Sequence, residues 1–167
     1  MDSATVKEPI LLMARYNLWA NDQFISFFRR QEPDLIEKFV PGSFPSIRKT
    51  LMHIWDAQYI WHRRLLGESP VTFPSSSWSG SLDEMYDGLN KSSKELIELV
   101  RSLAIYEMQE VIRYTTMTAG PQASKRYEVL LHVFNHSMYH RGQCVTMART
   151  LSMEGIPSTD LIKYLRT

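Results

Sequence analysis

Cysteine is almost missing from this sequence, which limits how the chain can be cross-linked or can bind metal. Cys144 is the one cysteine among 167 residues, so an internal disulfide and a C-x-x-C metal motif are both excluded. The lone thiol fits a reducing compartment, and we expect it to be a small core residue. Any metal would have to rely mainly on histidine and carboxylate ligands.

An excess of charge of either sign is also missing. Nineteen Lys and Arg residues stand against eighteen Asp and Glu residues, which gives a formal net charge of +1. Proteins that bind nucleic acid through its phosphates usually carry a clear basic excess. Nucleic acid is therefore not expected as a partner.

Long apolar runs are missing as well. The longest uncharged apolar runs, such as Ile10 to Met13, are much shorter than the roughly 20 residues that span a bilayer. Residues Met1 to Pro9 lack the basic and apolar regions of a secretion signal. We therefore expect no membrane association and a cytoplasmic location.

The composition that remains is that of an ordinary globular protein, with 44% apolar and 22% charged residues. Such a composition gives no support to disorder or low complexity. A chain of this length can bury one sizeable core without disulfides, so we predict a single domain over residues 1–167.

Four long segments carry apolar residues at the three- and four-residue steps of an amphipathic helix. They run from Val6 to Arg30, from a cap at Ser46 to Leu65, from a capping box at Ser81 and Glu84 to Leu103, and from a cap at Ser124 to Leu151. Short helical turns are expected at residues 34–40 and 160–165. The alternation from Glu107 to Thr116, with a turn signal at Gly120-Pro121, indicates a short extended excursion.

The simplest architecture for four long helices is a bundle in which they pack around one core. We therefore predict an all-α fold, an up-and-down four-helix bundle with a short extra C-terminal helix.

Three of the five histidines, His132, His136 and His140, follow one another at four-residue steps on the last long helix. Residues four apart lie one above the other, so two neighbouring imidazoles can hold one metal ion, whereas the first and last are too far apart. On a helical wheel His140 lies in the apolar stripe, His136 at its margin and His132 toward the polar side. The inward pair is thus His136 and His140. The spacing alone leaves open that both are ordinary histidines, hydrogen-bonded across the helices or partly exposed.

A third ligand would have to come from another helix, and His53 is the natural candidate. It borders the apolar face of its predicted helix, which permits the role without demanding it. His62 lies nearly opposite on the same helix and is expected to be solvated, as are Arg63 and Arg64 at the helix end.

Three runs of this sequence resemble, in order and spacing, the DinB family within the DinB/YfiT-like metalloenzymes. They are Tyr16-Asn-Leu-Trp19-Ala-Asn21, Ser46-Ile-Arg-Lys-Thr-Leu51-Met-His53-Ile and Leu131-His-Val-Phe-Asn-His136-Ser-Met-Tyr-His140-Arg141-Gly142-Gln143. The resemblance implies a four-helix bundle, often a homodimer, with a divalent metal such as nickel or zinc bound at His53, His136 and His140. Many members carry a further histidine where this chain has Tyr139.

Three imidazoles leave coordination positions open for solvent or substrate, which is typical of catalytic metal sites. Relatives of the superfamily include thiol-dependent enzymes. The resemblance therefore implies a metal-dependent transferase or hydrolase that acts on a small molecule, with a thiol as a possible partner. The alternative is a non-catalytic metal-binding or stress-response module.

No catalytic residue is assigned from the sequence, because it shows no paired carboxylates, Ser/His/Asp arrangement or phosphate-binding loop. Tyr16, Asn17, Asp56 and Gln143 could approach the site from their helices. Each is better explained by a helix surface or by hydrogen bonding between helices.

Overall fold

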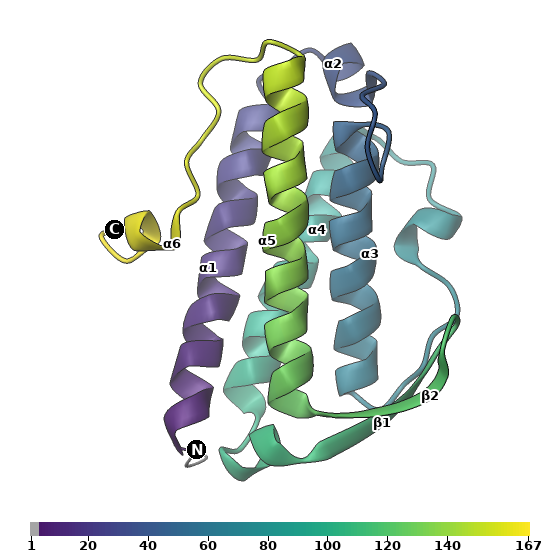
Figure 1. The fold of residues 1–167 in the computed structure, drawn as a ribbon, viewed down its shortest axis with the longest axis vertical. Coiled ribbons are helices and arrows are strands. Elements are labelled where there is room, and N and C mark those ends of the chain that lie inside the picture. Colours follow the sequence, from purple (N-terminus) through teal and green to yellow (C-terminus); the bar gives the residue numbers. More distant parts are fainter. Residues whose placement is uncertain (1–3) are drawn as a thin grey trace.

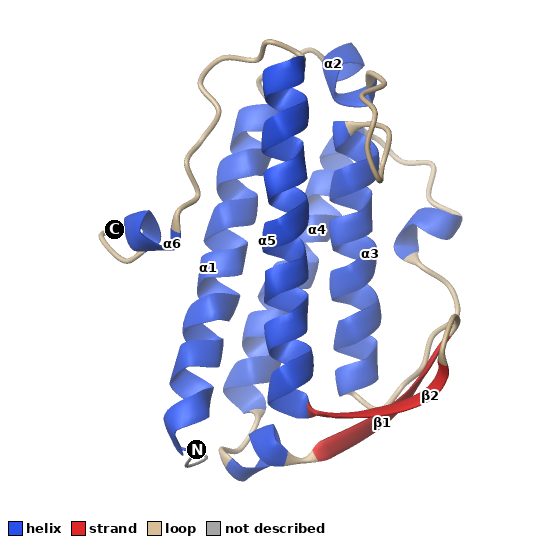
Figure 2. Ribbon diagram, viewed as in Figure 1, coloured by secondary structure: helices blue, strands red, loops and turns tan. Residues whose placement is uncertain are grey.

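The computed structural model describes residues 4–167, and most of them are helical (Figures 1 and 2). The helices are α1 (Ala4–Phe28), α2 (Pro33–Glu37), α3 (Ile47–Leu65), α4 (Leu82–Ser102), α5 (Arg126–Thr150) and α6 (Leu161–Tyr164), and 3-10 turns span Pro74–Ser76 and Tyr106–Gln109. The strands β1 (Val111–Thr116) and β2 (Gly120–Lys125) form a hairpin before α5. The prediction of a mostly helical protein is confirmed. None of the helices within residues 4–167 is both long and apolar enough to cross a bilayer.

Two of the three predicted N-caps are confirmed. The Ser46 hydroxyl accepts a hydrogen bond from the Lys49 backbone N–H at 3.2 Å and so caps α3. At the start of α4, Ser81 Oγ accepts from the Glu84 N–H at 3.2 Å while the Glu84 carboxylate accepts from the Ser81 N–H at 2.7 Å. Because these bonds satisfy N–H groups that lack a partner inside the helix, they fix where both helices begin.

The all-α prediction is wrong in one respect, because the segment before α5 forms a two-stranded antiparallel sheet. Residues Val111 to Thr116 pair with Lys125 to Gly120, so Gly120-Pro121 begins β2 and is not the turn itself. The predicted cap at Ser124 is also wrong, since this residue lies in β2 and its hydroxyl bonds to that of Tyr114. The helix begins only after the strand ends.

The predicted up-and-down order is wrong, because α3 and α4 run in the same direction (Figure 1). Gln58 of α3 contacts Ser93 of α4, and the start of α1 meets the end of α4 where Lys7 bonds to the Arg101 carbonyl at 3.0 Å. Residues 66–81 carry the chain back along α3, held midway where the Ser75 N–H donates to Asp56 at 2.9 Å. This long crossover makes a parallel pair possible.

The core has two apolar parts with a polar layer between them. One part holds Phe24, Leu51, Met85 and Cys144, and the other holds Ile10, Leu96, Leu130 and Phe134, in each case with further apolar neighbours. Cys144 is fully buried, as predicted for a small core residue, and burial raises the pKa of its thiol to about 12.

The polar layer starts at Arg141 of α5, which is 2% exposed. Its guanidinium donates to the side-chain oxygens of Asn17 at 2.7 Å and Asn21 at 2.9 Å, both on α1. A buried cation must find hydrogen-bond acceptors, because otherwise its loss of hydration is uncompensated. The contact therefore fixes how α5 lies against α1.

From Asn21 the hydrogen bonds continue into the other two long helices. The side-chain amide of Asn21 donates to Ser93 Oγ of α4 at 3.0 Å. Ser93 Oγ in turn donates to the side-chain oxygen of Gln58 on α3 at 2.9 Å. The Gln58 amide in turn reaches Ser137 Oγ of α5 at 3.5 Å. One connected set of buried side chains thus joins α1, α3, α4 and α5.

This layer predicts different effects for two neighbouring serines of α4. Ser93→Ala should lower the free energy of unfolding by about 2 kcal/mol, because it leaves the Asn21 amide and the Gln58 carbonyl without their partner. Ser92 is the matched control, since it is also buried but its hydroxyl has no partner in the described part of the chain. Ser92→Ala should change the value by less than about 0.5 kcal/mol. Urea denaturation measures both, and equal losses would contradict the network.

Candidate metal centre

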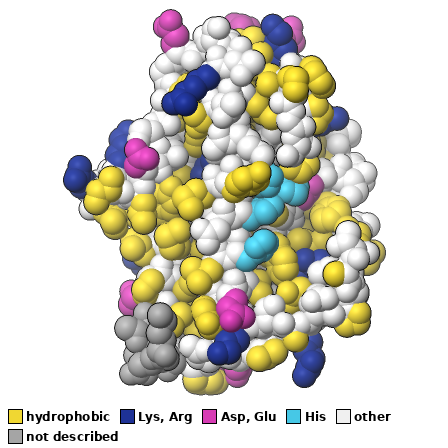
Figure 3. Space-filling model, viewed as in Figure 1, with side chains coloured by type: hydrophobic (Ala, Val, Ile, Leu, Met, Phe, Trp, Pro, Cys, Tyr) yellow, Lys and Arg dark blue, Asp and Glu magenta, His cyan; other side chains and the backbone are white. Residues whose placement is uncertain are grey.

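Three histidines from two helices meet at mid-height between α3 and α5. The Nε2 atom of His136 lies 3.1 Å from Nε2 of His53 and 3.1 Å from Nε2 of His140. One nitrogen from each of the three rings lies within 4.8 Å of the others. Histidine side chains are visible together on one face of the molecule, between apolar patches (Figure 3).

The helix periodicity explains why these three residues converge. His136 and His140 are one turn apart on α5, and α3 runs antiparallel to α5, so His53 arrives at the same height. His140 is buried whereas His136 and His53 are half-buried. The structure therefore brings together the three residues named from the sequence. On α5, His140 is more buried than His136, as the helical wheel indicates.

Gln143 orients the innermost ring. Its side-chain oxygen lies 2.8 Å from Nδ1 of His140. When that Nδ1 carries the proton and donates it to Gln143, Nε2 of His140 presents its lone pair to the cluster. The interpretation of Gln143 as a surface residue or a bridge between helices is therefore wrong. Its three-residue spacing from His140 was the signal in the sequence.

Burial keeps the three imidazoles neutral. Desolvation is the main cause that lowers the pKa of His53 to about 4, and repulsion by His140 in its protonated form is the second. Desolvation is also the main cause that lowers the pKa of His136 to about 3, and repulsion by the neighbouring histidines adds to it. Desolvation also lowers the pKa of His140, and the hydrogen bond to Gln143 opposes this shift. At neutral pH all three rings are thus free to donate a lone pair.

The distances fit a metal ion. A cation held about 2.0–2.1 Å from each nitrogen separates the nitrogens by roughly 3.0–3.4 Å, depending on the coordination angle. The two separations of 3.1 Å fall in this range. Whichever tautomer His136 adopts, its Nε2 atom has either one proton to donate or one lone pair to accept with, so without a cation it cannot bond well to both neighbouring nitrogens. The cluster could therefore hold a metal ion, with three neutral nitrogen ligands and coordination positions left over.

Aromatic rings flank the cluster. Phe44, in the segment before α3, stacks on His53 with ring centroids 4.1 Å apart, and Tyr139 meets His140 edge-on at 5.0 Å. A hollow of about 280 Å³ lies beside His53 and is lined by Phe44, Lys49, Met52, Asp56 and Ser75. Phe44 was not found from the sequence, because it stands in an irregular segment whose course no periodicity describes.

The other two histidines lie outside the cluster. His132 is exposed, in agreement with its place toward the polar side of the wheel, and packs edge-on against Trp61 with ring centroids 5.1 Å apart. His62 is half-buried, not fully solvated, and desolvation lowers its pKa. The prediction of a solvated Arg64 is wrong, because its guanidinium is buried over the Trp61 ring at 4.5 Å from the centroid.

The remaining candidates have structural roles. Asn17 bonds to Arg141 across the helices, as expected, and the Tyr16 hydroxyl donates to the Thr159 carbonyl at 2.6 Å. The Asp56 carboxylate accepts from both the backbone and the hydroxyl of Ser75. Each of these three side chains is thus hydrogen-bonded to another part of the protein, and none bonds to a histidine of the cluster.

Comparison with known proteins gives matches over nearly the whole chain. The model of the DinB family matches residues 1–166. Protein DinB of Bacillus subtilis (strain 168) is 24% identical over 157 residues, which cover 90% of each chain. The uncharacterized protein YizA of the same organism is 22% identical over 151 residues, which cover 90% of this chain and 93% of YizA.

Two solved structures share the fold. A DinB-like protein from Bacillus cereus ATCC 10987 superposes with a TM-score of 0.71 at 13% identity, covering 90% of this chain and 95% of that one. The DinB-like protein YjoA from Bacillus subtilis gives a TM-score of 0.60 at 9% identity, covering 93% and 97%. At such identities the likeness shows the fold alone.

Acid should destabilise the metal-free protein. The folded-state pKa values of His53 and His136, about 4 and about 3, lie below the ordinary value of 6.5. Between pH 6.5 and about 4 the unfolded chain therefore binds protons that the folded chain does not, so the free energy of unfolding falls as pH falls. Urea denaturation in the presence of a chelator measures this slope. His136→Phe should flatten it, and an unchanged slope in this variant would contradict the assignment to the cluster.

Proposed function

The chain belongs to the DinB family, and from this membership and the histidine geometry we propose that His53, His136 and His140 bind one divalent metal ion for chemistry on a small molecule. The observation that carries the proposal is the pair of 3.1 Å separations between the Nε2 atoms. Nickel or zinc is the proposed metal, because imidazole ligands suit both.

The residues around the cluster have distinct roles in this proposal. His53, His136 and His140 hold the ion, and Gln143 keeps His140 in the tautomer that donates from Nε2. Phe44 and Tyr139 restrict the access of water to the rings. When bound, such an ion lowers the pKa of a thiol or water placed at an open position and so makes a nucleophile near neutral pH. The proposed reaction is a transfer to a thiol or a hydrolysis.

A non-catalytic metal-binding or stress-response module is the second candidate. It is favoured by the hydrogen bonds of Asp56, the residue whose carboxylate lines the hollow beside His53. Both of its oxygens accept hydrogen bonds from Ser75. The contact with Ser75 thus gives this carboxylate a structural role that requires no ligand in the hollow.

The proposal also includes the architecture and assembly that the family resemblance implies, and the location expected from the sequence. We assign α1, α3, α4 and α5 to a four-helix bundle with one long crossover, supported by the polar layer that joins all four. A homodimer, a small-molecule or thiol partner and a cytoplasmic location stay predictions.

Metal content is the first test. His53→Ala, His136→Ala and His140→Ala should each sharply reduce the metal bound to protein purified without a histidine tag, because two imidazoles hold an ion far less tightly than three. Elemental analysis after dialysis measures the content. His62→Ala and His132→Ala are the controls, since both lie outside the cluster, and they should keep the wild-type content. Near-stoichiometric metal in His140→Ala would contradict the assignment.

Turnover is the second test. The metal-loaded protein should catalyse the reaction of a low-molecular-weight thiol with one of a panel of electrophiles. Chelation of the metal should abolish this reaction, because the thiol is then no longer activated. Product formation by mass spectrometry, with metal added back to the chelated protein, measures this. Full metal occupancy without turnover on any pair of substrates would instead support the non-catalytic module.

A further inference from the structure

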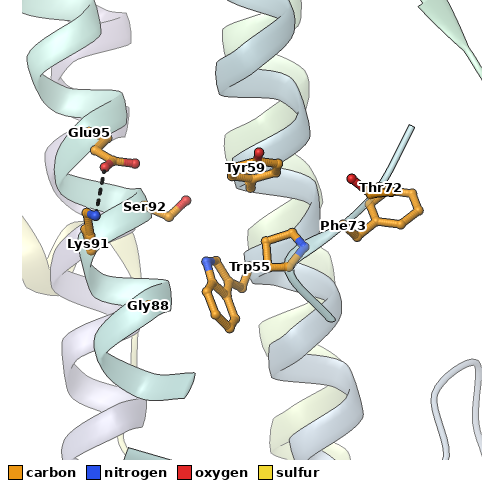
Figure 4. Close-up of a pocket in the computed structure, with 9 residues that line it drawn as sticks. Trp55, Tyr59, Thr72, Phe73, Gly88, Lys91, Ser92 and Glu95 are labelled. Atoms are coloured by element: carbon orange, nitrogen blue, oxygen red, sulfur yellow. Dashed lines mark ion pairs between the residues drawn. The ribbon is translucent and has the colours of Figure 1, made fainter. Parts of the chain in front are cut away.

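A second hollow lies on the other side of α3 from the histidines. At about 100° per residue, Trp55 and Tyr59 stand roughly 200–240° around α3 from His53. Together with Phe73 of the crossover segment and with Ser92 and Glu95 of α4 they line a hollow of about 370 Å³ (Figure 4). Its volume is within the range of small-molecule sites.

The wall formed by α4 is shaped to accept the indole of Trp55. Gly88 lies against this ring so closely that an added Cβ would come within 2.5 Å of it. Trp55 also meets Trp78 edge-on, with ring centroids 6.1 Å apart, which restrains the indole from the side of the crossover segment. The aromatic wall of the hollow is therefore held in place by packing.

A buried polar group at this wall has no partner. Ser92 is 4% exposed, and its hydroxyl makes no hydrogen bond to any described residue. In Figure 4 this hydroxyl points from α4 toward α3, that is, toward the gap between the two helices. Buried hydroxyls without partners are uncommon, so this one marks an unfilled hydrogen-bonding position behind the wall of the hollow.

The charges at the hollow belong to one ion pair. Lys91 and Glu95 are 3.9 Å apart, and the Lys91 side chain is 79% exposed. Exposed pairs of this kind contribute little, so the lysine can leave Glu95 at small cost. With Lys91 turned into solvent, the hollow keeps one carboxylate beside the rings of Trp55, Tyr59 and Phe73, and aromatic π faces attract cations.

We propose that this hollow binds a small organic cation, a substituted ammonium with short apolar groups. Trp55, Tyr59 and Phe73 contact its apolar groups, and Glu95 neutralises its charge. The site is separate from the histidine cluster and does not depend on a bound metal.

Choline and 3,3-dimethyl-1-butanol test the role of the charge, because the alcohol has nearly the same shape but a carbon in place of the charged nitrogen. Choline should bind saturably to the wild-type chain, and the neutral analogue should bind at least about tenfold more weakly. Isothermal calorimetry measures both affinities. Nuclear Overhauser contacts between the choline methyl protons and the Trp55 indole give the location.

Variants separate this site from the rest of the protein. Glu95→Gln should weaken choline binding by about fivefold, and Trp55→Leu should weaken it further and remove the indole contacts. Glu98→Gln is the matched control, because it makes the same change one turn along α4 at a residue outside the hollow, and it should bind as the wild type does. Should Trp55→Leu fail to fold, Glu95→Gln with its control still decides the outcome.

The proposal would be overturned by equal affinity for the neutral analogue, by no binding of choline at tens of millimolar, or by preferential binding of benzoate that is lost in Lys91→Ala. Choline binding that is lost in His140→Ala or with a chelator would place the cation at the histidine cluster and would also overturn it. Choline binding that persists in His140→Ala supports the separate site, whatever the outcome for the metal.

Discussion

The buried charge of Arg141 is the constraint on which the arrangement of the long helices depends. A guanidinium that is 2% exposed loses nearly all its hydration, and desolvation accordingly lowers its pKa. In the described residues its hydrogen-bond acceptors are the amide oxygens of Asn17 and Asn21, both on α1. Sliding or rotating α5 against α1 would break these bonds inside the core, where nothing replaces them. The polar layer therefore selects one register, whereas the apolar parts on either side would tolerate several.

That register also sets the histidine cluster. Arg141 follows His140 directly, so the contact of Arg141 with α1 turns His140 and the preceding turn with His136 toward α3. Ser137, beside His136, bonds through Gln58 to the same layer and holds α3 at the height where His53 arrives. The nitrogen separations thus depend on side chains that lie outside the cluster.

Features that depend on neighbours in the sequence could be predicted, and features that depend on distant contacts could not. The caps at Ser46 and Ser81 and the inward pair on α5 follow from spacings of three and four residues. The shared direction of α3 and α4 depends on where residues 66–81 pack. Their packing includes a hydrogen bond between Ser75 and Asp56, two residues too far apart in the sequence for a local pattern to predict the contact. The cap predicted at Ser124 failed because strand pairing with Ile112 competes with helix formation there. The contribution of Phe44 to the centre likewise comes from an irregular segment.

The crossover has an electrostatic consequence for the centre. Helices α3 and α4 run in one direction and α1 and α5 in the other, so each long helix has one parallel and one antiparallel neighbour. As a result, the macrodipoles of the four helices largely cancel. What remains of their field is concentrated in the first and last turns, whereas His53, His136 and His140 lie well inside α3 and α5. The ends of the helices therefore contribute little to the electrostatic potential at the three rings, where desolvation and the contact with Gln143 dominate.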